Sequence, residues 1–281
     1  MLAPSPLRRA RNPRAASAFA CALSFVTAVG VSAADAAEHT LMPSPKTVHI
    51  GYFLATVKPV LTIDSGDIVT IESAASVVPS VVDHSGVVPP SAVPQYQRDI
   101  YGEVKDRGPG PHILTGPIEI RGAEPGDVLE VRILDIGLAL DWGFNRQRPY
   151  TGALPDEFTA IWSRVIPIDR QAKTAEVAKG VVVPVDKPFF GTMGLAPDPT
   201  LGRISSGPPG VHSGNMDNKD LVAGTTLFMP VQASGALFSA GDAHAAQGHG
   251  EVDLTAIVTQ VVDGTKGIHG MIPKSIFVAQ R

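Results

Sequence analysis

Residues 204–260 contain two dense groups of polar and ionisable side chains. They read ISSGPPGVHSGNMDNKDL (204–221), continue through two apolar runs (222–240), and close with GDAHAAQGHGEVDLTAIVTQ (241–260). The polar side chains form two groups around the apolar runs: His212, Asn215, Asp217 and Asp220, then Asp242, His244, His249, Glu251 and Asp253. Intervening glycines permit tight turns and close backbone approach. Carboxylates and imidazoles on such loops are typical of metal or hydrolytic sites.

The spacing of this stretch also predicts its local structure. Residues 225–232 and 236–240 have the composition of strands, and Ala-Ser-Gly at 233–235 predicts a hairpin turn between them. Asp242 and His244 are two residues apart, so they face the same side of an extended segment. Apolar and polar residues alternate again in residues 251–260, which predicts another strand. We therefore expect the second polar group where one strand ends and the next begins.

An ordinary turn is the alternative for each of these residues taken singly. Asp and Gly are common turn residues, and a single His is more often structural than a ligand. A plain hairpin does not need two His, one Glu and two Asp between residues 242 and 253. The density of ionisable side chains therefore favours a functional site.

Four segments of the chain resemble the acetamidase/formamidase family. The most specific are GNMD (214–217) and GDAHAAQGHGE (241–251), and LTGPIEIRGAEPGDVLEV (114–131) and GTMGLAP (191–197) match as well. Paired motifs of this length are more specific than a lone glycine motif. The resemblance extends from about Thr56 to about Gln260. It implies hydrolysis of short carboxamides, such as formamide or acetamide, to ammonia and a carboxylate, on a mainly β, sandwich-like fold with few short helices.

Amide hydrolysis requires an activated nucleophile and stabilisation of the oxyanion. In a metal-dependent interpretation, Asp217, Asp242 and His244 are the expected ligands, and Glu251 is the general base or a fourth ligand. Zinc is the expected metal, and the carboxylate-rich set also suits calcium or manganese.

Four further side chains are expected to assist at this site. Asn215 is expected to donate to the substrate oxygen and His249 to protonate the departing amine, while His212 and His84 are expected to contact the substrate. The resemblance implies a site carboxylate soon after the second strand, where Asp83 or His84 lies within the Pro- and Gly-rich segment 73–116. A surface lid is an equal alternative for that segment.

A serine nucleophile remains the alternative mechanism. It would use Ser205, Ser206 or Ser213 together with His212, but the chain has no Gly-x-Ser-x-Gly motif of the nucleophile-elbow kind. Two other classes stay open as well. One is an exported, catalytically impaired relative that acts as a small-ligand-binding or structural β-protein, and the other is a hydrolase of a different small amide.

The N-terminal segment has the three-part pattern of a secretory signal peptide. Four arginines within residues 8–14 precede an apolar run at 15–31, and small residues follow at 32–37. We expect cleavage near Ala36 or Ala37 and export to the periplasm or medium, with no stable membrane insertion after processing. An uncleaved anchor is the alternative, but the run is short and contains Ser and Thr. This division leaves residues 38–281 as the functional domain.

Charge and cysteine content exclude several classes of protein. Without residues 1–37 the chain has 19 basic and 26 acidic side chains and no basic block, so we expect no nucleic-acid partner. The single cysteine, Cys21, lies inside the expected signal, so the remainder has neither a disulfide nor a thiol nucleophile. A small amide is the expected partner, and a homodimer is compatible with the composition.

The remaining segments complete the expectation of a β-rich fold. Strands are predicted at residues 47–53 and 60–71, the latter interrupted by a hairpin turn at 65–67, and at 117–136, 161–168 and 180–185. A loop is predicted at 142–158, and the best helical segment is 171–179. The resemblance implies that relatives continue with a further strand and helices, which residues 270–275 begin. The C-terminal helical part is therefore expected to be truncated.

Overall fold

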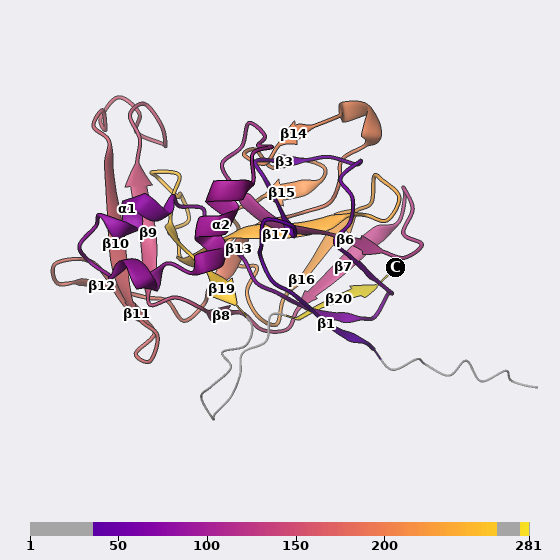
Figure 1. The fold of residues 1–281 in the computed structure, drawn as a ribbon, viewed down its shortest axis with the longest axis horizontal. Coiled ribbons are helices and arrows are strands. Elements are labelled where there is room, and N and C mark those ends of the chain that lie inside the picture. Colours follow the sequence, from indigo (N-terminus) through magenta and orange to yellow (C-terminus); the bar gives the residue numbers. More distant parts are fainter. Residues whose placement is uncertain (1–35, 263–275, 281) are drawn as a thin grey trace, which may run out of the picture. The chain divides into compact units, whose positions relative to one another are not determined.

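The protein is built mainly from β-strands, as the sequence predicts (Figure 1). The computed structural model describes residues 36–262 and 276–280. Residues 1–35 of the expected signal peptide and the segment 270–275 lie outside these described residues. Within them, the strands form two large sheets and two short pairs.

The first sheet has five strands and alternates clearly between buried and exposed side chains. In spatial order it contains β1 (Glu38–Leu41), β5 (Ile68–Ile71), β20 (Ile276–Gln280), β7 (Val128–Ile133) and β16 (Thr226–Pro230). In β7, Leu129, Val131 and Ile133 are buried while the residues between them are more exposed. This is the period of two that a half-buried strand requires.

The second sheet has eleven strands and contains the polar residues of interest. Its main path is β12 (Val181–Pro184), β11 (Thr174–Ala178), β10 (Trp162–Asp169), β9 (Trp142–Gln147), β18 (Ile257–Thr259), β17 (Phe238–Ala246), β13 (Phe189–Gly194) and β15 (Ser213–Asn215). β6 (Ile113–Ile120) also pairs with β17, and with β2 (Val48–Ile50) and β4 (Leu61–Ile63). The two short pairs are β3 (Tyr52–Phe53) with β14 (Ile204–Ser205) and β8 (Gly137–Leu138) with β19 (Val261–Val262).

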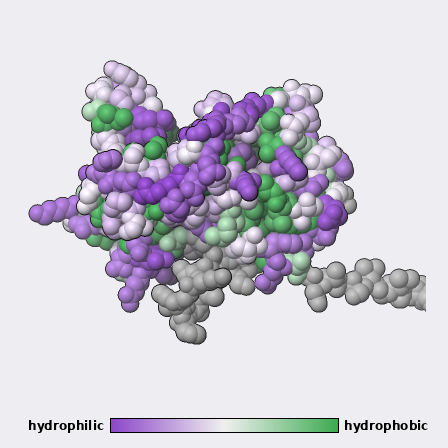
Figure 2. All heavy atoms as spheres, viewed as in Figure 1, coloured by the Kyte–Doolittle hydropathy of each residue, from purple (hydrophilic) through white to green (hydrophobic). Residues whose placement is uncertain are grey.

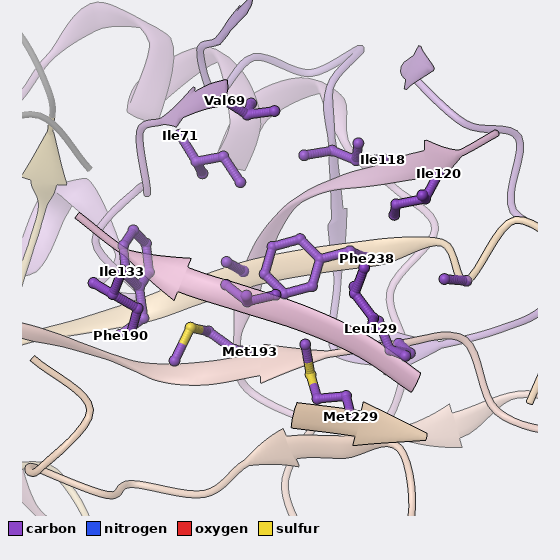
Figure 3. Close-up of a cluster of buried hydrophobic side chains, with 14 of the residues drawn as sticks. Val69, Ile71, Ile118, Ile120, Leu129, Ile133, Phe190, Met193, Met229 and Phe238 are labelled. Carbon is purple, nitrogen blue, oxygen red and sulfur yellow. The ribbon is translucent and has the colours of Figure 1, made fainter. Parts of the chain in front are cut away.

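The main hydrophobic core lies between the two sheets, as in a sandwich (Figure 3). Val69, Ile71, Leu129, Ile133 and Met229 come from the first sheet, and Ile118, Ile120, Phe190, Met193 and Phe238 come from the second. Packing of this kind immobilises β17, which carries Asp242 and His244, and β13, which pairs with it.

Short helices occupy the segment 73–116, for which the sequence predicted a loop. They are α1 (Pro79–Asp83), the 3₁₀ turn η1 (Pro90–Ala92) and α2 (Gln95–Glu103), and a second 3₁₀ turn, η2, spans Pro199–Leu201. Val82 and Val93 pack against Trp142 and Phe144 of β9, so the segment covers one face of the second sheet. Among the described residues, no helix is long and apolar enough to cross a bilayer.

Several local predictions are wrong because tertiary pairing overrides local pattern. The segments 225–232 and 236–240 are strands but not a hairpin, since β16 pairs with β7 while β17 lies in the other sheet. Likewise β4 and β5 flank the turn at 65–67 but belong to different sheets. The expected helix at 171–179 is strand β11, and the expected loop after Trp142 begins with strand β9.

The surface that Figure 2 shows mixes hydrophilic and hydrophobic residues, with the apolar ones in small separate groups. Scattered apolar side chains of this kind are normal for a folded protein. On this face, the arrangement gives no reason to look beyond the cavities for a binding site.

Candidate active site

Asp242 and His244 lie inside β17 and not at its end, where the sequence placed them. Both side chains are buried, and both line a cavity of about 260 Å³. His244 Nε2 lies 3.4 Å from Asp242 Oδ2, so the two side chains share a face as predicted. β17 pairs along its edges with β13, β6 and β18, and the side chains on both of its faces are buried.

Strand pairing brings Asp217 to the same place. Thr192 of β13 is in register with Asn215 of β15 and with Gly241 of β17. The Asn215 amide accepts from the Thr192 hydroxyl at 2.7 Å and donates to Asp217 Oδ2 at 2.6 Å. Asn215 therefore holds the Asp217 carboxylate in a fixed orientation beside β17, and both residues line the cavity.

Glu251 reaches the cavity from the loop between β17 and β18. Asn145 on β9 donates to Asp253 Oδ2 at 2.9 Å and to the backbone oxygen of Ala256 at 2.7 Å. The Thr255 hydroxyl donates to the backbone oxygen of Arg146 at 2.6 Å. These bonds tie the loop to β9. The expected strand at 251–260 is therefore shorter than predicted, because only β18 within it pairs with neighbouring strands.

Asp217, His244 and Glu251 form one cluster, as the sequence predicts for Asp217 and Glu251. One nitrogen or oxygen atom from each of them lies within 4.8 Å of those from the other two. Asp217 and Glu251 are therefore close enough to contact one small ligand or ion together.

His112 is a member of the site that the sequence did not single out. It immediately precedes β6, and the pairing of Leu114 with Gly241 of β17 sets it beside Asp242. His112 Nε2 lies 3.4 Å from Asp242 Oδ2, and the side chain is buried. No local spacing could reveal this contact, because it depends on a strand pairing across more than a hundred residues.

Hydrogen bonds fix the orientation of both imidazoles. His112 Nδ1 donates to the backbone oxygen of Ser206 at 2.9 Å. His244 Nδ1 donates to Gln247 Oε1 at 2.7 Å, and the Gln247 amide nitrogen donates to the backbone oxygen of Asp217 at 2.7 Å. Because Nδ1 carries the proton in each ring, Nε2 is the atom presented to Asp242 and the cavity.

The charged groups of the cluster strongly shift one another's pKa values. Burial alone would raise the pKa of Asp242, but His112 and His244 outweigh it and hold that pKa at about 2. Burial alone would lower the pKa of His244, but Asp242 and then Asp217 raise it to about 9. Burial and the negative charge of Asp217 raise the pKa of Glu251 to about 8, and burial followed by Asp242 raises the pKa of Asp217. Such shifts are typical of functional clusters.

Three histidines that the sequence predicts as substrate contacts or proton donors, His84, His212 and His249, do not line this cavity. His84 is exposed at the C-terminal end of α1, where Nδ1 donates to the Ser80 backbone oxygen, and it does not line this cavity. Asp83 pairs with Arg98. His249 is exposed in the β17–β18 loop and His212 packs edge-on against Phe53, so neither contributes to the cavity lining.

The donor atoms of the cluster fit a divalent metal ion. Within the described part of the chain, Asp217 Oδ1 is buried and has no hydrogen-bond partner, which is costly unless another group satisfies it. A Cβ atom on Gly191 would lie 2.5 Å from Asp217 Oδ1 and 3.0 Å from His244 Cε1, so only glycine leaves this space open. Imidazole nitrogens together with carboxylate oxygens suit zinc better than calcium.

Comparison with known proteins agrees with the motifs. The model of the Acetamidase/Formamidase family matches residues 107–206 and 200–277. An acetamidase from Mycolicibacterium smegmatis is 30% identical over 251 residues, covering 65% of this chain and 62% of that protein. A formamidase from Methylophilus methylotrophus is 30% identical over 197 residues, covering 52% and 48%. The chain thus spans less than two thirds of each of these relatives.

A solved structure with the same fold extends the similarity to three dimensions. The predicted acetamidase/formamidase from the thermophile Thermoanaerobacter tengcongensis is 27% identical, with a TM-score of 0.66 over 87% of this chain and 69% of that one. The family model covers more than half of the present sequence, including both glycine-rich motifs and the strands that hold the cluster. The chain therefore belongs to the acetamidase/formamidase family.

Proposed function

We propose that the protein hydrolyses the C–N bond of short linear carboxamides, with water as the second reactant and ammonia and a carboxylate as products. The observation that carries this proposal is the cluster around one cavity, in which Asp242 and His244 are buried and Asp217 and Glu251 are half-buried. The names of the acetamidase and formamidase relatives support the reaction type.

In this proposal Asp217, Asp242 and His244 hold a divalent metal ion, with zinc preferred over manganese or calcium. His112 presents its Nε2 to the same region and joins them as a further ligand. The metal would supply Lewis-acid polarisation of the amide carbonyl and acidification of water. The unpartnered Asp217 Oδ1 and the two oriented imidazoles are what support this assignment.

Glu251 is the proposed proton carrier. Its carboxylate lines the cavity beside Asp217 and His244, where it is placed to take a proton from water and return it to the leaving nitrogen. Asn215 has one amide hydrogen committed to Asp217 and a second available to the substrate oxygen. Glu251 takes over the proton donation that the sequence assigned to His249, because His249 is exposed outside the cavity lining.

The serine mechanism has less geometric support. His212 Nε2 is buried without a hydrogen-bond partner among the described residues, so it forms no Ser–His pair there. Burial also lowers the pKa of His212. Ser206 is fully buried and serves His112, whose ring it positions through its backbone oxygen.

Ammonia release by the purified protein tests the proposal. Formamide, acetamide and propionamide would be assayed before and after treatment with a chelator, and again after addition of zinc, manganese or calcium. We expect ammonia from at least one amide, loss with the chelator, and recovery with zinc. Turnover that survives complete metal removal would contradict the metal assignment. Absence of turnover with every metal, together with tight binding of an amide, would instead favour the ligand-binding alternative.

A further inference from the structure

Arg146 of strand β9 and Arg148, just after its end, lie on the wall of the active-site cavity. Side chains of a strand alternate between its faces, and Phe144, Arg146 and Arg148 are two residues apart. All three line the cavity that contains the carboxylate cluster. Asn145, between them, faces the opposite side and lines a different cavity.

Arg146 contacts the ring of Phe144, 6.0 Å from its centroid, but has no ion-pair partner within the described part of the chain. Its Nε is buried and has no hydrogen-bond partner there, and no described carboxylate forms an ion pair with Arg146 or Arg148. Other arginines are paired in the usual way: Arg98 with Asp83, Arg121 with Asp64 and Arg203 with Asp106. A partly buried guanidinium without an anionic partner is costly, so its retention on a cavity wall points to an anionic ligand.

Arg146 lies on the side of the cavity away from the acidic cluster. It also lines a neighbouring cavity, whose lining includes none of Asp217, Asp242 and Glu251. Burial, followed by the positive charge of Arg148, lowers the pKa of Arg146. The active-site cavity therefore has a reactive end lined by carboxylates and a cationic end lined by the two arginines.

The cavity is also larger than the smallest amides require. One water molecule needs roughly 10–15 Å³ of such space, whereas the cavity offers about 260 Å³. Formamide and acetamide contain only three and four non-hydrogen atoms. The neighbouring cavity has a volume of about 490 Å³ and shares Phe144 and Arg146 with the first. Space for a longer substrate therefore continues past Arg146.

We propose that the preferred substrate is a short carboxamide whose far end carries a carboxylate, held by Arg146 and Arg148 while the amide lies at the Asp217–His244–Glu251 cluster. A guanidinium matches a carboxylate with paired hydrogen bonds, which fixes both position and orientation. The inference rests on the proposed amide hydrolysis and adds the chemical class of the substrate. Hydrolysis of such a compound consumes one water and yields ammonia and a dicarboxylate.

Three amides of equal length test the charge preference. Butyramide, succinamate and succinamide differ only at the far end, which carries a methyl, a carboxylate or a neutral carboxamide. We expect kcat/KM for succinamate to exceed that for butyramide, and that for succinamide per amide group, by at least tenfold. The preference should shrink as salt is added, because Arg148 is exposed and its charge is screened.

Arginine variants test whether Arg146 and Arg148 cause the preference. In Arg146→Gln we expect the ratio of kcat/KM for succinamate over butyramide to fall at least tenfold, chiefly because KM for succinamate rises. In Arg148→Gln we expect the same ratio to fall by a smaller factor. Arg121→Gln is the matched control, because this arginine is exposed, pairs with Asp64 and does not line the cavity. Its ratio should stay at the wild-type value.

The outcomes separate this inference from the proposed function. Equal turnover of succinamate and butyramide would overturn the charge preference and leave amide hydrolysis intact. The same holds if the ratio survives in Arg146→Gln. Absence of ammonia from these three compounds, with formamide or acetamide still hydrolysed, would also overturn the charge preference alone. Absence of ammonia from all of these amides would overturn the proposed hydrolysis. In that case calorimetric binding of succinamate against butyramide, in wild type and Arg146→Gln, decides the charge preference alone: tighter succinamate binding that Arg146→Gln abolishes supports it, and equal binding overturns it.

Discussion

His244 Nδ1 lies 2.7 Å from Gln247 Oε1, and this contact fixes the ring nitrogen that faces the cavity. The amide of Gln247 is itself oriented, because its nitrogen donates to the backbone oxygen of Asp217. One glutamine therefore connects His244 of β17 with Asp217, which lies just after β15. Partners of this kind usually hold a metal-binding imidazole in position.

Replacing Gln247 by Leu should weaken metal binding without unfolding the protein. Loss of a hydrogen bond to a ligand imidazole typically costs roughly 10–100-fold in metal affinity or activity. The measurement is metal affinity by competition with a chelator, together with ammonia release. Gln95→Leu is the control, since Gln95 is exposed and contacts Asp99 on α2. Unchanged metal affinity in Gln247→Leu would show that the glutamine does not orient the ring.

Gly191→Ala should damage the site more than the fold. The added Cβ would lie 2.5 Å from Asp217 Oδ1 and 2.9 Å from the backbone oxygen of Asp242, closer than such contacts normally allow. We expect at least a tenfold loss of metal affinity and of kcat/KM, with a cooperative thermal transition retained. Gly102→Ala, where a Cβ meets nothing within 4 Å, should behave as wild type. Full activity of Gly191→Ala would contradict the crowding argument.

The loop that carries Glu251 depends on its bonds to β9. Asn145→Ala removes two of them and Thr255→Val removes a third, and each bond contributes about 1 kcal/mol. A displacement of the reacting groups by about 1 Å can cost roughly a hundredfold in rate. We therefore expect both variants to lower kcat by more than tenfold and to increase hydrogen exchange in residues 247–256. Faster exchange with unchanged kcat would separate loop order from catalysis.

His49 should make the protein less stable in acid. Burial lowers its pKa from 6.5 to about 4, and its Nε2 lies 3.0 Å from the Ser239 hydroxyl. Between these pH values the unfolded chain binds a proton that the folded chain refuses, so stability falls as pH decreases through that window. The loss is about 3 kcal/mol over the whole window and is absent above pH 6.5.

Denaturant unfolding of wild type and His49→Gln at pH 7.5 and pH 4.5 measures the contribution of His49 to the loss of stability in acid. The difference in unfolding free energy between the two pH values should be smaller by about 2–3 kcal/mol than in wild type. His84→Gln is the matched control, because His84 is exposed, and its difference should equal that of wild type. An unchanged difference in His49→Gln would mean that the buried imidazole does not govern acid stability.

The sequence predicts strands well where one face meets the core. Leu129, Val131 and Ile133 alternate because β7 is buried on a single side. β17 has no such alternation, because both of its faces are buried, and its position and length could not be predicted. Strand partners were equally inaccessible, which is why the hairpin predicted between residues 225 and 240 does not form.

The site was predictable only in part, for the same reason. Asp242 and His244 share a strand, so their spacing alone placed them together. His112 joins them through the pairing of β6 with β17, and Arg146 through the pairing of β9 with β18, which no local pattern encodes. His84 lies exposed at the end of the short helix α1 and does not line this cavity, so its substrate contact stays a prediction without support from the cavity's geometry.

The metal content of His244→Ala, measured by elemental mass spectrometry and compared with its ammonia release, tests most directly whether a metal held by this cluster hydrolyses the amide. His249→Ala is the control, because His249 is exposed and outside the cavity lining. We expect His244→Ala to lose the metal and the amide turnover together. His249→Ala should keep the metal, and its rate of ammonia release should change by less than tenfold. Wild-type metal content and wild-type turnover in His244→Ala would contradict this expectation.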